Sequence, residues 1–158
     1  MALSMKVGSV KLSLALATAF LLANCAKDQS LIADVGLRSV RLVAQENANK
    51  KQVIRVHFVF PKNSDLLAEL RKMDATTYFE QVGQLLNDYP NDLEIVEAEV
   101  VPGMSVDKEI ELKDFRSKAV LVFFDYDKSL RGRHREELRK LCRSAQINLG
   151  RNDVTISY

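Results

Sequence analysis

Alternation of apolar and polar side chains constrains the fold of this chain more than any other feature. Residues 52–60 place Ile54, Val56, Phe58 and Phe60 on one face. A period of two residues is typical of a β-strand with one buried face. The same period recurs in residues 39–45, 93–101 and 106–112. The sequence therefore predicts a mainly β fold.

The last third of the chain adds further strands. Residues 119–124 are apolar on both faces, as expected of a central strand with both faces covered. Residues 146–149 and 154–158 flank the turn-forming sequence Gly-Arg-Asn-Asp at 150–153. This arrangement predicts a closing hairpin.

Two turn-forming segments connect the earlier strands. Residues 46–51 are polar and contain two asparagines, so we expect a hairpin between the first two strands. Pro102-Gly103 fits the centre of a type II turn, because proline presets the first torsion angle and glycine tolerates the positive second one.

Three segments change to a helical period. Ser64 marks the start of one helix, and a Thr77–Glu80 capping box marks the start of a second. Residues 135–145 predict one amphipathic helix, with apolar residues at Leu138, Leu141, Cys142 and Ala145. We therefore expect a β-sandwich of about seven strands with short helical insertions.

The beginning of the chain has the features of a secretory signal. Lys6 and Lys11 flank the start of an apolar segment, residues 12–23, which is shorter than the roughly 20 residues that span a bilayer. Residues 22–25, Leu-Ala-Asn-Cys, resemble a bacterial lipobox. This resemblance implies that Cys25 becomes the first mature residue and carries acyl chains that anchor it in a membrane. The alternative is a plain signal peptide and an ordinary thiol at Cys25.

Cleavage before Cys25 would divide the chain into a signal peptide, residues 1–24, and one domain, residues 25–158. These 134 residues suffice for a hydrophobic core. Ala26 follows the cysteine, which by resemblance to the enterobacterial sorting rule favours the periplasmic face of the outer membrane. One further cysteine, Cys142, remains, so no disulfide framework is expected. A Cys25–Cys142 bridge is the alternative.

Charge argues against general nucleic-acid binding. The formal net charge of +2 comes from the two lysines of the signal segment, so the mature part has 21 basic and 21 acidic side chains. Residues 128–151 nevertheless hold 8 basic and 2 acidic residues. We interpret this stretch as a solvated face or as a contact for anionic headgroups, cell-wall polymer or an acidic partner. The possible basic surface consists of Arg131, Arg133 and Arg139.

The sequence contains no motif for catalysis, cofactor binding or metal binding. A glycine-rich phosphate loop, paired metal-binding cysteines and a His-Glu-x-x-His helix are all missing. His57 lies in mid-strand and is interpreted as a sheet-surface residue, and Cys142 as a small core side chain. We expect a protein that is not an enzyme and needs no cofactor.

Taken in their order along the chain, the predicted segments resemble those of the TssJ family, the outer-membrane lipoproteins of type VI secretion systems. The resemblance covers most of residues 38–128 and 145–158. It rests on the loop after the first strand, on the helical segment, on the apolar strand, and on three motifs: Val-Ile-Arg-Val-His-Phe at 53–58, Val-Pro-Gly-Met-Ser at 101–105 and Asn-Leu-Gly-Arg-Asn-Asp-Val-Thr-Ile at 148–156. The family usually has a tryptophan after the apolar strand, and this chain has none.

The resemblance implies a transthyretin-like sandwich that is tethered to the outer membrane and binds the periplasmic part of a TssM-like inner-membrane protein. In the family, the loop between the first two strands contacts this partner. That loop corresponds here to Glu46, Asn47, Ala48, Asn49, Lys50 and Lys51. From the residues alone, it is an ordinary polar connection. The alternative function is a free-standing periplasmic lipoprotein that binds a small ligand or a cell-wall polymer through its basic end.

Overall fold

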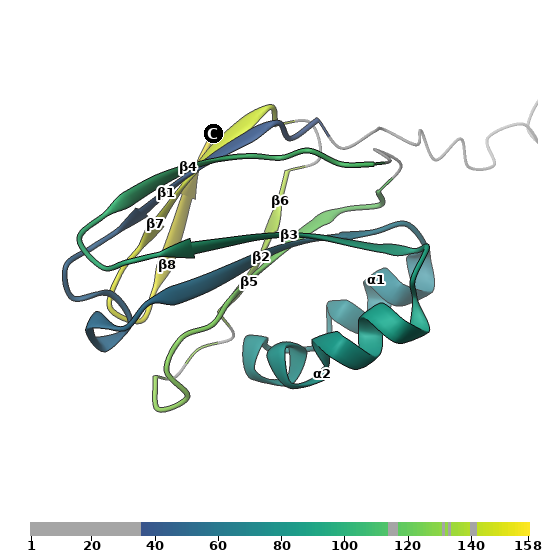
Figure 1. Ribbon diagram of the computed structural model, residues 1–158, viewed down its shortest axis with the longest axis horizontal. Coiled ribbons are helices and arrows are strands. Elements are labelled where there is room, and N and C mark those ends of the chain that lie inside the picture. The colour runs from purple at the N-terminus through teal and green to yellow at the C-terminus, as the bar shows by residue number, and fades with distance from the viewer. Residues whose placement is uncertain (1–35, 114–116, 131, 133, 140–141) are drawn as a thin grey trace, which may run out of the picture. The chain divides into compact units, whose positions relative to one another are not determined.

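The strands form two sheets that face each other across a shared core (Figure 1). The computed structural model describes residues 36–113, 117–130, 132, 134–139 and 142–158. Within these residues there are eight strands, four in each sheet. The mainly β sandwich with short helical insertions is therefore confirmed, and it has one strand more than the expected number of about seven.

The first sheet has the strand order β4-β1-β7-β8. β1 pairs antiparallel with β4 and parallel with β7, so an early and a late segment of the chain lie side by side. β7 and β8 pair antiparallel, which confirms the predicted closing hairpin. The strands are β1 (Ser39–Ala44), β4 (Ser105–Glu109), β7 (Ser144–Leu149) and β8 (Val154–Ser157).

The second sheet has the strand order β3-β2-β5-β6. All neighbouring strands in it pair antiparallel. β5 lies in the interior of the sheet and is buried along its whole length, as its continuous apolar sequence predicted. The strands are β2 (Ile54–Pro61), β3 (Leu93–Val100), β5 (Val120–Phe124) and β6 (Arg135–Leu138).

Two helices cover the outer face of the second sheet, α1 (Ser64–Leu70) and α2 (Ala75–Asp88) (Figure 1). Asn63 caps α1, because its side chain accepts a hydrogen bond of 2.7 Å from the amide of Leu66. Asp74 caps α2 by accepting one of 2.8 Å from the amide of Thr77. Ser64 and Thr77, the predicted starts, therefore lie inside the observed helices.

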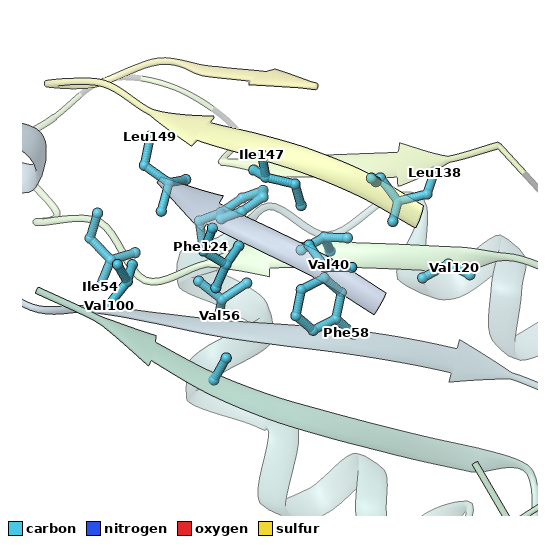
Figure 2. Close-up of a cluster of buried hydrophobic side chains, with 14 of the residues drawn as sticks. Val40, Ile54, Val56, Phe58, Val100, Val120, Phe124, Leu138, Ile147 and Leu149 are labelled. Atoms are coloured by element: carbon cyan, nitrogen blue, oxygen red, sulfur yellow. The ribbon is translucent and has the colours of Figure 1, made fainter. Parts of the chain in front are cut away.

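The core between the sheets is built from the alternating side chains that the sequence indicated. Figure 2 shows Val56, Phe58 and Phe124 of the second sheet opposite Val40 and Ile147 of the first. All five are at most 1% exposed. Each fully buried side chain of this size stabilises the fold by about 1.5–3 kcal/mol, so this layer holds the two sheets together.

The predicted hairpin between the first two strands is wrong. β1 and β2 belong to different sheets, and β1 pairs with β4 and β7 instead. The segment between them is therefore an arch that crosses from one sheet to the other. Both strands bury their apolar face toward the same core, and an arch satisfies this pattern as well as a hairpin does.

The predicted helix over residues 135–145 is also wrong. Its first part is the edge strand β6, and its last residues begin β7. Leu138 and Ala145 are both buried in the core, as the helical pattern required, but they reach it from different sheets. Apolar spacing alone did not separate one helix from two short strands.

The predicted type II turn between β3 and β4 is confirmed. Gly103 has a φ of +83°, and the amide of Met104 donates a hydrogen bond of 3.0 Å to the carbonyl of Val101. In the described part of the chain, no helix is long and apolar enough to cross a membrane.

Candidate functional site

The arch between β1 and β2 contains the predicted contact residues 46–51. It ends in a short turn, Ala48–Lys51, in which Asn49 and Lys50 have non-helical backbone angles. Three successive residues, Asn49, Lys50 and Lys51, have positive φ angles of 43°, 54° and 68°. Residues other than glycine seldom adopt this backbone conformation. Contacts with other parts of the protein must therefore hold the arch in it.

Asn49 supplies most of these contacts. Its side chain is 2% exposed. Its amide nitrogen donates to the carbonyls of Val53 at 3.2 Å and Asp125 at 3.4 Å, and its oxygen accepts from the amide of Asp127 at 2.5 Å. A buried side-chain amide with donors and acceptors satisfied fixes the backbone around it. Asn49 therefore fastens the arch to the loop that follows β5.

A charged contact at the surface reinforces this connection. The Lys50 ammonium lies 3.1 Å from a carboxylate oxygen of Asp127 and also donates to the Ser129 hydroxyl. Hydrogen bonds from the Ser129 hydroxyl and amide, together with that from Lys50, lower the pKa of Asp127 to about 2. Asp127 is thus ionised at neutral pH and keeps the Lys50 side chain beside the loop.

The loop after β5 is in turn fixed to the β7–β8 turn. The Tyr126 hydroxyl donates to the carbonyl of Gly150 at 3.0 Å, and burial raises the pKa of this hydroxyl. The Tyr126 ring stacks on His134 with 4.4 Å between centroids. His134 Nε2 lies 3.3 Å from the carbonyl of Asn152, and burial lowers the pKa of His134. Three loops from both sheets therefore form one connected end of the sandwich.

The arch presents only part of its sequence to solvent. Ala48 and Asn49 are buried, whereas Glu46, Asn47, Lys50 and Lys51 are exposed. The amide of Asn49 also donates a hydrogen bond of 3.2 Å to the carbonyl of Arg151 in the β7–β8 turn. The six predicted residues thus divide into two that hold the arch in place and four that a partner could contact. The sequence did not predict that Ala48 and Asn49 hold the arch in place, because nothing in this polar loop indicates that Asn49 is buried.

The basic stretch does not form one continuous surface in the described residues. Lys128 pairs with Glu80 of α2 at 2.5 Å. Arg135 donates to backbone carbonyls at the end of α1, including that of Met73 at 3.1 Å. Arg139 lies at the far end of β6 with its guanidinium 4.7 Å from the Tyr158 ring centre. Arg131 and Arg133 lie outside the described residues.

A groove of about 510 Å³ on the outer face of the first sheet is a separate feature. Its lining includes neither Arg139 nor any residue of the loop end. Most of the lining side chains are polar or charged: Ser39, Arg41, Asp107, Lys108, Glu109, Ser144, Gln146, Ser157 and Tyr158. Among the described residues, this groove and Arg139 of the basic stretch therefore do not form one site.

His57 is not a surface residue, contrary to the interpretation of the sequence. It is 6% exposed because α2 covers this face of β2. Its Nδ1 lies 3.1 Å from the Tyr78 hydroxyl, and its Nε2 lies 3.8 Å from a Glu97 carboxylate oxygen. Burial lowers the pKa of His57, while Glu97 opposes this shift. The Tyr78 ring stacks on Phe123, so His57 is part of the packing between helix and sheet.

Cys142 is the one cysteine within the described residues, and it is partly buried. Cys142 packs partly against the core, as expected, and its thiol donates to the carbonyl of Arg139 at 2.9 Å. Burial raises the pKa of this thiol, which disfavours the reactive thiolate. In the described residues, no group of three His, Cys, Asp or Glu side chains could hold a metal ion. Cys25 lies outside the described residues.

The fold of this chain is similar to that of several solved structures. Neither protein-family models nor curated proteins match the chain. Among solved structures, the type VI secretion lipoprotein TssJ1 from Pseudomonas aeruginosa is 18% identical, with a TM-score of 0.58 over 77% of this chain and 93% of the TssJ1 chain. Lip from Serratia marcescens, a membrane-bound component of the Type VI Secretion System, is 15% identical, with a TM-score of 0.55 over 76% and 96% of the two chains.

A third similar chain comes from a structure of the TssM C-terminal domain from EAEC. It is 17% identical, with a TM-score of 0.55 over 77% of this chain and 97% of that chain. The fold thus defines the class of protein: a two-sheet β-sandwich with a pair of helices on one outer face. Within this class, the similar structures are TssJ lipoproteins of the type VI secretion system, in agreement with the resemblance seen in the sequence.

Proposed function

We propose that this protein is a lipoprotein of a type VI secretion system that binds the periplasmic domain of a TssM-like inner-membrane protein. The observation that carries this proposal is the match of the fold to nearly the whole length of TssJ-type chains. A fold alone does not fix a function. The lipobox-like sequence at residues 22–25 and the exposed arch after β1 add two independent features that suit a membrane-anchored binding protein.

The anchor would be Cys25, on the periplasmic face of the outer membrane. Leu37 is fully buried and lies about 12 residues after Cys25. A chain of this length spans at most ~40 Å. The domain would therefore stay close to the membrane while its loop end remains free to meet a partner from the inner membrane.

The contact would be made by the exposed side chains of the arch, Glu46, Asn47, Lys50 and Lys51. Because Asn49 already holds the arch in its conformation, binding would order little additional backbone. Less conformational entropy is then lost on association. No catalytic step and no cofactor is part of this function.

The test uses the tagged full-length protein in detergent, with the TssM-like protein of the same organism as the probe. We expect the two proteins to co-purify. Replacing Asn47, Lys50 and Lys51 by Ser should weaken binding at least about tenfold, on the order of 1.4 kcal/mol. Replacing Arg131, Arg133 and Arg139 by Ser is the matched comparison and should leave binding within about twofold. Loss of binding in the arginine variant with normal binding in the arch variant would overturn the assignment of the interface.

A further inference from the structure

Exposed apolar side chains gather beside the arch. In the described residues, five large apolar side chains are exposed, and three of them lie at the loop end: Val53 at 49%, Val101 at 50% and Met104 at 59%. The other two, Leu86 of α2 and Tyr158, lie elsewhere. Single exposed apolar residues are ordinary, but a cluster of them indicates a contact surface.

The three residues lie close together in the chain's path around the ends of β2 and β3. The pairing of β2 with β3 ends at Ile54 opposite Val100. Val53 directly precedes β2 and Val101 directly follows β3, so both residues adjoin this last pair. Met104 closes the type II turn that starts at Val101, which brings their α-carbons to within about 7 Å.

This cluster is continuous with the arch. The Asn49 side chain donates its hydrogen bond to the carbonyl of Val53, at 3.2 Å. The amide of Gly103 donates to the carbonyl of Ala44 at 3.0 Å, directly before the arch. A β-carbon at Gly103 would lie 3.6 Å from Cγ of Glu46. The apolar cluster and the exposed arch residues therefore form one surface.

The charges around the cluster indicate what kind of partner it fits. Arg55 and Glu99 face each other in the register, next to the last pair of Ile54 and Val100. Arg55 also forms an ion pair of 2.5 Å with Asp125. Glu46 and Lys51 are exposed on the arch side. An apolar centre with a rim of both charge signs is typical of protein interfaces, whereas an anionic membrane surface attracts clusters of basic residues.

We propose that Val53, Val101 and Met104 form the apolar centre of the surface that binds the TssM-like protein, with the arch as its polar rim. This inference rests on the proposed function and adds the β3–β4 turn to the binding site. The partner should present apolar side chains opposite this cluster. The Met104 side chain, which is flexible and polarizable, adapts to such a surface.

The experiment compares three variants of the full-length protein in detergent, with the TssM-like protein as the probe. The first replaces Val53, Val101 and Met104 by Ser, and the matched control replaces Leu86 and Tyr158, the other two exposed apolar residues, by Ser. We expect the first variant to bind at least about tenfold more weakly and the control to bind within about twofold of the wild type. The third variant, Met104→Glu, introduces one charge at an exposed site and should also reduce binding. It tests the surface even if the triple variant folds poorly.

The outcomes separate the two proposals. If the wild type does not bind the probe, the proposed function fails and this inference fails with it. If the wild type binds and both the triple variant and Met104→Glu bind as tightly, only the inference is overturned. A further arm tests a membrane contact with Cys25→Ser protein and vesicles of phosphatidylethanolamine and phosphatidylglycerol. Vesicle binding that disappears in the triple variant, with binding to the probe unchanged, would also overturn the inference.

Discussion

The side-chain oxygen of Asn49 accepts a hydrogen bond of 2.5 Å from the backbone amide of Asp127, 78 residues further along the chain. This contact joins the arch after β1 to the loop after β5, and so connects the two sheets at the loop end. The same side chain donates to two carbonyls. Asn49 therefore determines the conformation of the surface that we propose to bind the partner.

Replacing Asn49 by Ala should destabilise the protein. The substitution removes three part-buried hydrogen bonds, one from the amide of Asp127 and two to the carbonyls of Val53 and Asp125, at a cost of about 1–3 kcal/mol. The free energy of unfolding is measured by urea denaturation. Asn47→Ala, at an exposed position of the same arch, is the control and should change stability by no more than about 0.5 kcal/mol. Equal stabilities of the two variants would contradict the role given to Asn49.

Stability should fall at mildly acidic pH, partly because of His57. Burial lowers its pKa below the value of 6.5 for the free side chain, so the folded state favours the neutral ring. The contribution of the neutral His57 ring to the free energy of unfolding is fully present above pH 6.5. It is lost as the pH falls through the folded-state pKa. Urea denaturation between pH 7.5 and pH 5 should therefore show a smaller loss for His57→Gln than for the wild type.

His134 has a pKa that is lowered in the same direction, so the His57 variant should retain part of the pH dependence. His134→Gln measures that part separately. An unchanged pH dependence in the His57 variant would mean that its ring gains a proton in the folded state as easily as in the unfolded state.

Replacing Cys25 by Ser should abolish acyl labelling and leave uncleaved or soluble periplasmic protein. The reason is that the thiol would be the attachment point of the first acyl chain, and stable anchoring needs more than one chain. Metabolic labelling with a fatty acid and membrane fractionation measure the two effects. Outer-membrane fractionation that is the same as in the wild type would argue against this anchor.

Residues 26–158 should fold without metal or disulfide. Cys142 is the one cysteine left in this segment, and the core layer between the sheets supplies the stabilisation. The midpoint of thermal unfolding should be the same with and without a chelator or a reductant. A large drop with either reagent would reveal a stabilising metal site or disulfide.

The sequence predicted those parts of the fold in which a periodic pattern has one structural solution. The alternation in β2 and the continuous apolar run of β5 both gave the correct strands, since buried faces impose the period directly. The Pro102-Gly103 turn was predictable because only a few residues tolerate its backbone angles.

The errors arose where the pattern has two solutions. Leu138 and Ala145 fit a helix as well as two strands that enter the core from different sheets. The sheet to which a strand belongs depends on contacts distant in sequence, such as the pairing of β1 with β7. The candidate site also depends on contacts between residues distant in sequence. The contact of Asn49 with Asp127 bridges 78 residues, and no local feature of the polar loop predicts it.

The position of β1 has a mechanical consequence. The proposed anchor precedes this strand and the arch follows it, so tension between the outer membrane and a bound partner passes along β1 itself. β1 is held over five residue pairs by β4 and over six by β7. The hydrogen bonds to the antiparallel β4 run across the strand direction, and those to the parallel β7 cross it at a slant. Tension along β1 therefore loads them in shear and together instead of opening them one at a time. A secretion apparatus that pulls on this subunit would therefore meet resistance from the whole length of its central strand.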